Sequence, residues 1–504
     1  MTSAEKLDPD FCYRIIQAKD ARFDGRIFVC VTSTGIYCRP VCPARVPHKE
    51  HCRFVASAAA AEALGFRSCL RCRPETAPGT PAWAGTQAAV ARALRLIEDG
   101  ALDRDGVEAL AARVGLGARQ LRRLFLAHIG ATPQAVAANR RLLAAKQLIS
   151  ETDMGFAEIA FAAGYQSLRR FNDAVRASYG VAPTALRRES AASRGAAPGA
   201  MTLRLGYRPP FDWERLLAYL SFRAIPGVEE ISGHVYRRSF RLPGASGNLQ
   251  VLPSKRPNTL EVRISADGNA PSRSIATRVR RLFDLDAEPQ AIAAALRDDA
   301  LLRPRLAALP GLRVPGAFDG FELAIRAILG QQVSVKGATT LAGRLVRRCG
   351  EAMPEASGGL THFFPAPEAI ADADLSGLGL TGGRISALKA FAGAVAKGAV
   401  TFDPAATLDE KIAEFCLVPG IGEWTAHYIA LRAVGEPDAF PASDLGLRKA
   451  AGGASPVTPR ALEAMAESWR PWRGYAALLL WMAPNIETQD LETRRAEPRA
   501  LAAD

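Results

Sequence analysis

The stretch "FCLVPGIGEWTAHYIALRAVGEPDAFPASDLGLRKA", residues 415–450, predicts two helices that are joined by a glycine-rich turn. In this turn, "LVPGIG", Gly420 and Gly422 lack side chains, so their backbone N–H groups can come close to a phosphate. Asp444 follows Gly422 by 22 residues and stands where a carboxylate can cap the next helix. The stretch therefore predicts a helix-hairpin-helix that is followed by an aspartate.

The sequence around this stretch predicts two regions that differ in secondary structure. Residues 201–274 predict a strand, a helix and further strands, whereas the pattern beyond about residue 275 is helical and is broken by Gly/Pro turns. A hairpin followed by an aspartate resembles the helix-hairpin-helix superfamily of DNA glycosylases. The segments "LRLGYRPPFDWERLLAYLSFRAIPGVE", "TRVRRLFDLDAEP", "GLRVPGAFDGFELAIRAILGQQVSV" and "WRPWRGYAALLLW" resemble bacterial 3-methyladenine DNA glycosylase II, over about residues 201–484.

The resemblance to this glycosylase implies a role for each matching residue. Asp444 matches the catalytic carboxylate, and Trp424, Tyr428 and Trp481 match residues that line the base pocket. Gln332, in "GQQVS", matches the wedge residue that fills the space left by the flipped nucleotide, where the bacterial enzyme has leucine.

The residue types suit this chemistry. An N-alkylated purine is cationic and already a good leaving group, so strong general-acid catalysis is dispensable. Electron-rich Trp and Tyr rings attract such a base by cation–π contact, and Asp444 would stabilise an oxocarbenium-like sugar or orient a water molecule. Two alternatives stay open here: Tyr428 and Trp481 also suit the core of an apolar helix, and Asp444 also suits a helix N-cap, which is compatible with catalysis.

The resemblance to this superfamily also implies a cation site at the hairpin and the lack of a lyase lysine. By analogy with them, the carbonyl groups of Cys416, Val418 and Ile421 are candidates to hold a monovalent cation. Bifunctional members carry a Schiff-base lysine just after the hairpin, where this sequence has Trp424, so we expect no lyase activity. The sequence has no C-terminal cysteine quartet for an iron–sulfur cluster.

Two units of helix, glycine-containing turn and helix lie at residues 106–130 and 155–180. The second has Gly164 at its turn and Ser167 as a candidate N-cap. The second helices carry polar residues that can reach base edges: Arg119, Gln120, Arg122, Arg123, Gln166, Arg169 and Arg170. With the connecting helix "PQAVAANRRLLAAKQLI" and the ending "YGVAPTALRR", these units resemble the DNA-binding domain of AraC-type regulators. A plain helical bundle with solvated arginines is the alternative.

Seven of the nine cysteines lie in the first 72 residues. In a reducing cytosol such a cluster indicates metal binding or reactivity rather than disulfides. The pairs Cys38-x3-Cys42 and Cys69-x2-Cys72 predict a four-thiolate zinc site, because each pair can hold one side of a tetrahedral ion. Alternative ligands nearby are His48, His51 and Cys52. The spacing alone favours a structural zinc ion over a reactive thiolate.

The flanking residues favour reactivity as well. "DARFDGRIFVCVTSTGIYCRPVCPAR…GFRSCLRCRPE" resembles the N-terminal domain of the bacterial adaptive-response protein Ada, over roughly residues 8–76. In that family four cysteines bind zinc, and the first also takes a methyl group from a DNA methylphosphotriester. The resemblance makes Cys38 the acceptor and places Thr34 and Arg45 near the acceptor and the DNA backbone. The sequence lacks the "PCHR" segment with which Ada repairs O6-methylguanine.

Zinc would keep the acceptor sulfur deprotonated, and four thiolates around a divalent ion carry a net charge of about −2, which favours attack on a methyl carbon. Transfer yields a neutral thioether, so it happens once per protein. It also removes negative charge that repels phosphates, so methylation should tighten DNA binding.

Charge and composition agree with a DNA-binding protein of several domains. The 504 residues carry a formal net charge of +13, and residues 1–200 hold 28 Lys+Arg against 18 Asp+Glu. The sequence has no run of 18 apolar residues, and its N-terminus, "MTSAEKLDPD", does not resemble a signal peptide. We therefore expect no membrane partner and a cytoplasmic, nucleoid-associated location.

The sequence predicts a mainly α chain of four domains with one β-containing part. These are an Ada-like zinc domain (1–78), an AraC-type double helix-turn-helix (84–188), a β-rich glycosylase N-terminal domain (201–274) and a helix-hairpin-helix glycosylase core (275–490). Pro/Gly-rich and small polar segments at 74–85 and 189–200 predict linkers.

The predicted function is alkylation repair and its regulation. A monofunctional glycosylase would excise alkylated purines such as 3-methyladenine, and methyl transfer to Cys38 would activate a regulator that binds double-stranded DNA and works with RNA polymerase. One competing hypothesis is a regulator whose glycosylase-like half is an inactive DNA-binding scaffold. Another is a glycosylase in which Cys38 is purely structural.

Overall fold

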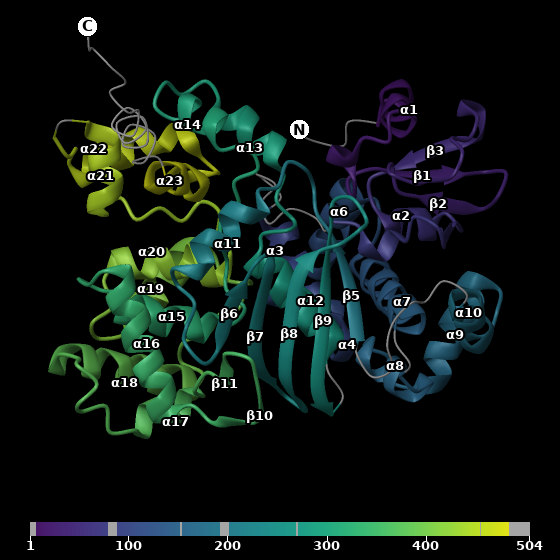
Figure 1. Cartoon of the computed structure of the whole chain (residues 1–504). Helices are drawn as coiled ribbons and strands as arrows, with labels where there is room; N and C mark the ends of the chain where they lie inside the picture. The colour runs from purple at the N-terminus through teal and green to yellow at the C-terminus, as the bar shows by residue number, and fades with distance from the viewer. Residues whose placement is uncertain are drawn as a thin grey trace, which may run out of the picture.

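The computed structural model describes residues 7–78, 88–151, 154–191, 201–268, 271–453 and 455–482. Most of both predicted linkers, and residues 483–490 of the predicted last domain, lie outside these ranges. Figure 1 shows a helical region on the left, a large sheet in the middle and the cysteine-rich part at the upper right.

The cysteine-rich part is a small sheet with the strand order β3-β1-β2-β4. Strand β1 is antiparallel to both of its neighbours, whereas β2 and β4 are parallel. The strands are β1 Phe28–Val31, β2 Ile36–Cys38, β3 Cys52–Val55 and β4 Arg67–Ser68. The helices and 3-10 turns are α1 Pro9–Gln17, η1 Ala21–Phe23, η2 Lys49–His51, α2 Ala58–Ala63 and η3 Pro74–Thr76. Only four buried residues form the main apolar cluster of this sheet, so a bound metal would contribute much of its stability.

The middle part is all helical and contains both predicted helix-turn-helix units. The first unit is α5 with α6, the second is α8 with α9, and the long helix α7 connects them. The helices are α3 Ala88–Glu98, α4 Ala101–Arg104, α5 Val107–Arg113, α6 Ala118–Ile129, α7 Pro133–Glu151, α8 Phe156–Ala162, α9 Leu168–Tyr179 and α10 Pro183–Ala191. Each unit buries its own apolar cluster, centred on Phe125 in the first and on Phe171 in the second.

Residues 201–268 form an antiparallel five-stranded sheet with the order β5-β9-β8-β7-β6. The elements are β5 Met201–Gly206, α11 Trp213–Ser221, β6 Glu229–Ser232, β7 Val235–Leu242, β8 Ala245–Pro253 and β9 Thr259–Gly268. The alternating apolar residues of these strands, such as Val262 and Ile264, face a core that α11 covers together with α12, Ser272–Leu282. The division that the sequence places after residue 274 stays a prediction.

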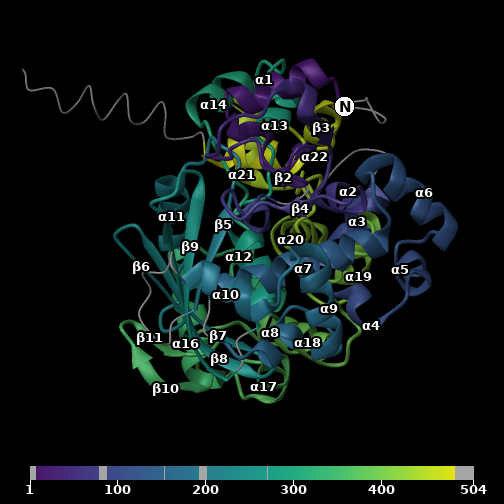
Figure 2. The ribbon, with the colours of Figure 1, turned by 90° about the vertical axis from the view of Figure 1, so that its right-hand side faces the viewer.

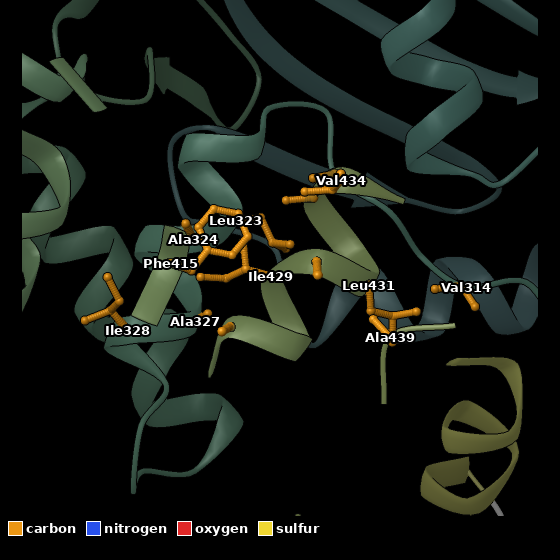
Figure 3. Packing of buried hydrophobic residues seen from close by; sticks show 14 of the residues in the cluster. Val314, Leu323, Ala324, Ala327, Ile328, Phe415, Ile429, Leu431, Val434 and Ala439 are labelled. Atoms are coloured by element: carbon orange, nitrogen blue, oxygen red, sulfur yellow. The ribbon is translucent and has the colours of Figure 1, made fainter. Parts of the chain in front are cut away.

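The C-terminal half is a helical bundle around one large core. Its centre is α15, Gly320–Leu329, in which nearly every side chain is buried; Figure 3 shows its residues Leu323, Ala324, Ala327 and Ile328 packed beside Phe415 and Ile429. The other elements are α13 Pro289–Leu296, α14 Arg303–Ala308, α16 Val335–Cys349, α17 Pro367–Asp372, α18 Gly382–Ala396, α19 Leu408–Cys416, α20 Glu423–Ile429, the π-helical turn η5 Ala430–Val434, α21 Leu445–Gly452, α22 Pro459–Ala466, η6 Glu467–Trp469 and α23 Arg473–Met482.

The purely helical pattern predicted beyond residue 275 is wrong at one place. Residues 352–362 form a hairpin of β10, Ala352–Ser357, and β11, Leu360–His362. Its strands are short and mostly exposed, and contacts with the five-stranded sheet hold them: Ser239 Oγ donates to the His362 carbonyl at 2.6 Å, and Thr361 N donates to the Gly227 carbonyl at 2.8 Å. Local sequence pattern cannot reveal such tertiary support.

Polar contacts join the cysteine-rich part to the rest of the chain. In Figure 2 the cysteine-rich part lies above α7, which passes beside the sheet that begins with β5. Lys146, on α7, is buried and donates from Nζ to the Cys69 carbonyl at 2.9 Å and to the Glu75 carboxylate at 2.8 Å. Arg208, after β5, donates to the Asp24 carbonyl at 3.1 Å and to the Asp286 carbonyl at 2.7 Å.

None of the helices in the described ranges combines the length and the apolar character that crossing a bilayer requires.

Candidate functional site

The four predicted zinc ligands come together. Cys38 ends β2 and Cys69 follows β4, the parallel neighbour of β2, and each strand is followed by a turn that brings back the second cysteine of its pair, Cys42 or Cys72. The four sulfur atoms lie within 4.8 Å of one another. A tetrahedral zinc ion with Zn–S bonds of about 2.3 Å needs sulfurs about 3.8 Å apart, so the set fits zinc.

The alternative zinc ligands are not part of this group. His48 and His51 are exposed, and the thiol of Cys52 donates instead to the His48 carbonyl at 3.3 Å. The four-thiolate prediction is therefore confirmed for the described residues.

The two cysteine pairs differ in exposure. Cys69 and Cys72 are buried, and backbone N–H groups donate to their sulfurs: Arg71 N to Cys69 at 3.3 Å and Arg39 N to Cys72 at 3.4 Å. Cys38 and Cys42 are half-buried, so this pair is less deeply buried than Cys69 and Cys72. Thr34 and Arg45 are exposed on the loops before and after this pair, and their roles stay predictions.

The buried side chain of Arg39 supports the same site. Its guanidinium forms an ion pair with Asp24 and donates to the Cys72 carbonyl at 3.0 Å and to the Thr76 hydroxyl at 2.6 Å. It therefore places a positive charge beside thiolates and fixes the turn that carries Cys72.

The predicted DNA-reading helices present most of their polar residues to solvent. Ser167 caps α9 by accepting from Arg170 N at 3.3 Å, which confirms the predicted N-cap. Arg119, Gln120, Arg123, Arg169 and Arg170 are exposed. Arg122 pairs with Glu108 at 3.0 Å, and Gln166 donates to the Asp103 carbonyl at 2.5 Å, so these two have partners within the chain.

The hairpin between α19 and α20 needs its first glycine. Gly420 has a φ of +87°, and a Cβ placed there would lie 2.6 Å from the Cβ of Ala387 on α18. Gly422 is the N-cap of α20 and is exposed. Gln331 fixes the turn by donating to the Gly420 carbonyl and to the Thr425 hydroxyl, both at 3.1 Å.

Gln332 is the tip of the neighbouring loop between α15 and α16. It is exposed and has a φ of +57°, a conformation that only a few per cent of non-glycine residues adopt. Because Gln331 is bound to the hairpin, Gln332 lies beside it, and its role as a wedge stays a prediction. The cation site stays a prediction, and the Val418 carbonyl already accepts from Ile421 N at 3.1 Å.

Asp444 caps α21, and two indoles hold its carboxylate in addition. Oδ1 accepts from Leu447 N at 2.9 Å and from Trp481 Nε1 at 3.0 Å, and Oδ2 accepts from Trp424 Nε1 at 2.8 Å. The N-cap interpretation is therefore confirmed. It does not compete with a catalytic role, since the cap uses one of the two oxygens.

The aromatic rings form a wall beside this carboxylate. Trp424 and Tyr428 are stacked, with centroids 5.5 Å apart and planes at 11°, and Trp481 meets Tyr428 edge-on with centroids 6.4 Å apart. All three rings are half-buried, and Tyr428 and Trp481 pack against the bundle core with part of their surface. Tyr428 and Trp481 thus contribute to the core, and the half-buried rings leave part of their surface free for a ligand.

Sequence reasoning missed Arg432 and Tyr219 behind this wall. Arg432 Nη1 donates to the hydroxyl oxygens of Tyr428 at 2.5 Å and of Tyr219, on α11, at 2.9 Å. One signal was available: Arg432 is a lone charge in the apolar run "IALRAV", which is unusual inside a buried helix. Nothing in the sequence indicated that Tyr219, 213 residues away, would meet it.

Four family models match the chain in succession. The "Metal binding domain of Ada" matches residues 11–75 and a "Helix-turn-helix domain" matches residues 110–189. The "AlkA N-terminal domain" matches residues 202–319, and the "HhH-GPD superfamily base excision DNA repair protein" matches residues 325–474.

Three similar proteins cover different parts of the chain. The "Probable bifunctional transcriptional activator/DNA repair enzyme AlkA" of Mycobacterium tuberculosis is 45% identical over 94% of this chain and 96% of its own length. The "DNA-3-methyladenine glycosylase 2" of Escherichia coli is 35% identical over 55% of this chain and 95% of its own length. The "Bifunctional transcriptional activator/DNA repair enzyme Ada" of Escherichia coli is 38% identical over 27% of this chain and 37% of its own length.

The mycobacterial protein thus matches this chain almost from end to end, across all four matched segments. By this similarity, the chain belongs to the family of bifunctional transcriptional activators and DNA repair enzymes named AlkA.

Proposed function

We propose that this protein repairs alkylated DNA and regulates the response to the damage. The C-terminal half hydrolyses the N-glycosyl bond of alkylated purines such as 3-methyladenine, and the N-terminal half takes one methyl group from a DNA methylphosphotriester and reads promoter DNA. The Asp444 carboxylate, held by two indoles beside a stacked aromatic wall, carries the glycosylase part of the proposal.

In the proposed excision, the flipped base stacks on the Trp424–Tyr428 wall. Its positive charge is attracted to the faces of electron-rich rings. As the bond to the base breaks, positive charge develops on the sugar, and the fixed Asp444 carboxylate stabilises it or orients the attacking water. The two indole N–H groups keep the carboxylate in place, so no reorganisation is needed at that moment.

The DNA backbone would be held by the hairpin. The N–H groups at Gly420 and Gly422, at the N-terminus of α20, offer a phosphate site. Gln332 at the neighbouring loop tip would fill the space left by the flipped nucleotide. Because its side chain is polar, we expect it to hydrogen-bond the unpaired partner base rather than only to stack.

The experiment that tests the glycosylase is release of 3-methyladenine from methylated duplex DNA. Asp444→Asn keeps the size of the side chain and the cap of α21 but removes the charge. We expect release by the wild type and a loss of at least about 100-fold in the variant. No release by folded, zinc-loaded wild type would overturn the proposal and favour a DNA-binding scaffold.

Methyl transfer is the second proposed reaction. Zinc, when bound by Cys38, Cys42, Cys69 and Cys72, keeps their sulfurs deprotonated at neutral pH. The Cys38 sulfur attacks the methyl carbon, the carbon–oxygen bond of the phosphotriester breaks, and the DNA leaves as a phosphodiester anion. The half-buried position of Cys38 supports this role, whereas Cys69 and Cys72 are buried. Thr34 and Arg45 are proposed to face the DNA backbone.

Mass analysis after incubation with phosphotriester-containing DNA tests this step. We expect a single added methyl group on Cys38. Cys52→Ser is a matched control because Cys52 lies on the same small sheet outside the sulfur cluster. A methyl group on another cysteine, or none at all, would contradict the assignment.

The helix-turn-helix units supply the regulatory part. Loss of one negative charge at the zinc site reduces repulsion of phosphates, so the methylated protein should bind its promoter more tightly. RNA polymerase is the proposed partner of the bound activator, and the nucleoid is its proposed location. Comparing promoter affinity before and after methylation at one salt concentration tests this part.

A further inference from the structure

Arg432 is a buried arginine at the base pocket that the proposed excision does not use. It lies in the π-helical turn η5, directly after the helix that carries Trp424 and Tyr428. Its Nη1 lies between the hydroxyl groups of Tyr428 and Tyr219, and its Nε donates to the Pro315 carbonyl at 2.5 Å. π-Helical turns occur frequently at functional sites.

Among the described residues, no Asp or Glu forms an ion pair with the Arg432 guanidinium within 4.0 Å, and the residue is 5% exposed. A buried cation without a counter-charge is costly. The groups near enough to supply one are the two phenols, since either becomes an anion on losing its proton.

The two phenols differ in how readily they ionise. Burial alone would raise the pKa of Tyr428, but the charges of Arg432 and Arg223 outweigh it and lower the pKa below its ordinary value. Burial raises the pKa of Tyr219, in spite of Arg432, so this neighbour keeps its proton. Arg223 lies with its guanidinium 3.7 Å from the centre of the Tyr219 ring.

The remaining charged groups around Tyr428 do not change this picture. Arg326, on α15, also lowers the pKa of Tyr428, although it is paired with carboxylates of its own. The Asp444 carboxylate accepts hydrogen bonds from the two indoles. Arg223, which follows α11, Arg326 on α15 and Arg432 in η5 therefore all favour the ionised phenol.

We propose that Arg432 and Tyr428 form a charge-matching pair in the base pocket, in which the Tyr428 phenolate neutralises the guanidinium, so that a bound cationic purine does not meet an uncompensated positive charge. This inference rests on the proposed glycosylase function. The phenol proton leaves to solvent, and the pair makes no covalent bond. A neutral damaged base brings no second positive charge, so its excision does not need the phenolate. The pair thus favours cationic bases when Tyr428 is ionised and loses that preference when Tyr428 is protonated.

The phenolate can be detected without any activity. We expect the ultraviolet absorbance of the zinc-loaded, full-length protein to show one tyrosine that ionises below the ordinary pKa of about 10. This step should vanish in Tyr428→Phe and move to higher pH in Arg432→Met. The matched control is Tyr475→Phe, which removes a buried tyrosine hydroxyl that bonds Asp284 away from the pocket and should keep the step.

The selectivity is tested by the pH dependence of single-turnover excision. The rate for cationic 3-methyladenine in methylated DNA should rise about tenfold per pH unit up to the ionisation of Tyr428, whereas the rate for neutral hypoxanthine should not rise with it. In Tyr428→Phe the two bases should show the same pH dependence. Arg432→Lys, which keeps the charge, should restore part of the rise that Arg432→Met removes.

Each outcome has one meaning. Absence of a low-pH tyrosine ionisation, or a rise for 3-methyladenine that persists in Tyr428→Phe, would overturn the charge-matching pair. If the ionisation is present and depends on Arg432 but the wild type excises no base, the phenolate pair is supported and the proposed glycosylase function is overturned.

Discussion

Asp444 depends for its orientation on indoles that lie 20 and 37 residues away in the sequence. Two of its three hydrogen bonds come from these side chains, and only one comes from its own helix. A single substitution can therefore turn the carboxylate without touching its charge.

Trp481→Phe tests this dependence, since it keeps a ring and removes the N–H donor. A hydrogen bond to a charged group is worth about 1.5–3 kcal/mol, so we expect a loss of about tenfold or more in excision rate. The control is Trp469→Phe, which removes a similar indole bond, from Nε1 to the Asp299 carboxylate at 2.7 Å, outside the site. Equal losses in both variants would mean that stability, not orientation, is affected.

Through Asp284, the free energy of unfolding is expected to depend on pH. Burial raises its pKa from an ordinary value of 3.8 to about 6, so between these values the folded protein keeps a proton that the unfolded chain has lost. Stability from this group is thus present at low pH and falls as the pH rises from about 4 to about 6, by at most about 3 kcal/mol. Denaturant unfolding of Asp284→Asn should lack this fall, and an unchanged pH dependence would contradict the assignment.

At the scale of elements, the hairpin between α19 and α20 has little tolerance at one position. Gly420→Ala would put a methyl group against Ala387 in a left-handed conformation, so we expect a loss of about 1–3 kcal/mol in the free energy of unfolding. At Gly422 a Cβ would meet no atom within 4 Å, so Gly422→Ala should leave stability nearly unchanged. Denaturation curves of the two variants compare these positions directly, and similar curves would contradict the steric argument.

Helix α7 does more than connect the two helix-turn-helix units. Lys146→Met would leave Glu75 buried without its nearest cation, and we expect the cysteine-rich part to lose about 3 kcal/mol of stability. The double variant Lys146→Met/Glu75→Gln should recover part of the loss. Thermal unfolding followed by hydrogen exchange in residues 7–78 measures both, and full stability of the single variant would show that the pair contributes nothing.

These elements show which features of the fold and the site can be predicted from the sequence. Cysteine spacing predicted the zinc ligands, and the "LVPGIG" turn predicted the hairpin, because both signals are local. The contacts of Lys146 with Glu75 and of Arg432 with Tyr219 could not be predicted, since each joins parts of the chain whose relative placement no local pattern encodes. The hairpin of β10 and β11 was missed for the same reason.

At the scale of the whole molecule, the zinc ion is expected to stabilise the N-terminal part. Its apolar cluster is small, so chelation of zinc should unfold most of residues 1–75. The C-terminal bundle has its own large core and should remain folded. Hydrogen exchange with and without a chelator measures the two parts separately; protection that does not change in the N-terminal part would count against a structural role for the metal.

The buried side chain of Arg208 limits how the two halves of this protein can be separated or exchanged. It belongs to the glycosylase half, yet one of its hydrogen bonds ends on a carbonyl of the cysteine-rich part. If either half were fused to another protein, the Arg208 guanidinium or the Asp24 carbonyl would lose its hydrogen-bond partner at the new interface. The two halves are therefore joined through a specific interface and not only through a linker, so neither half can be exchanged without loss of this contact.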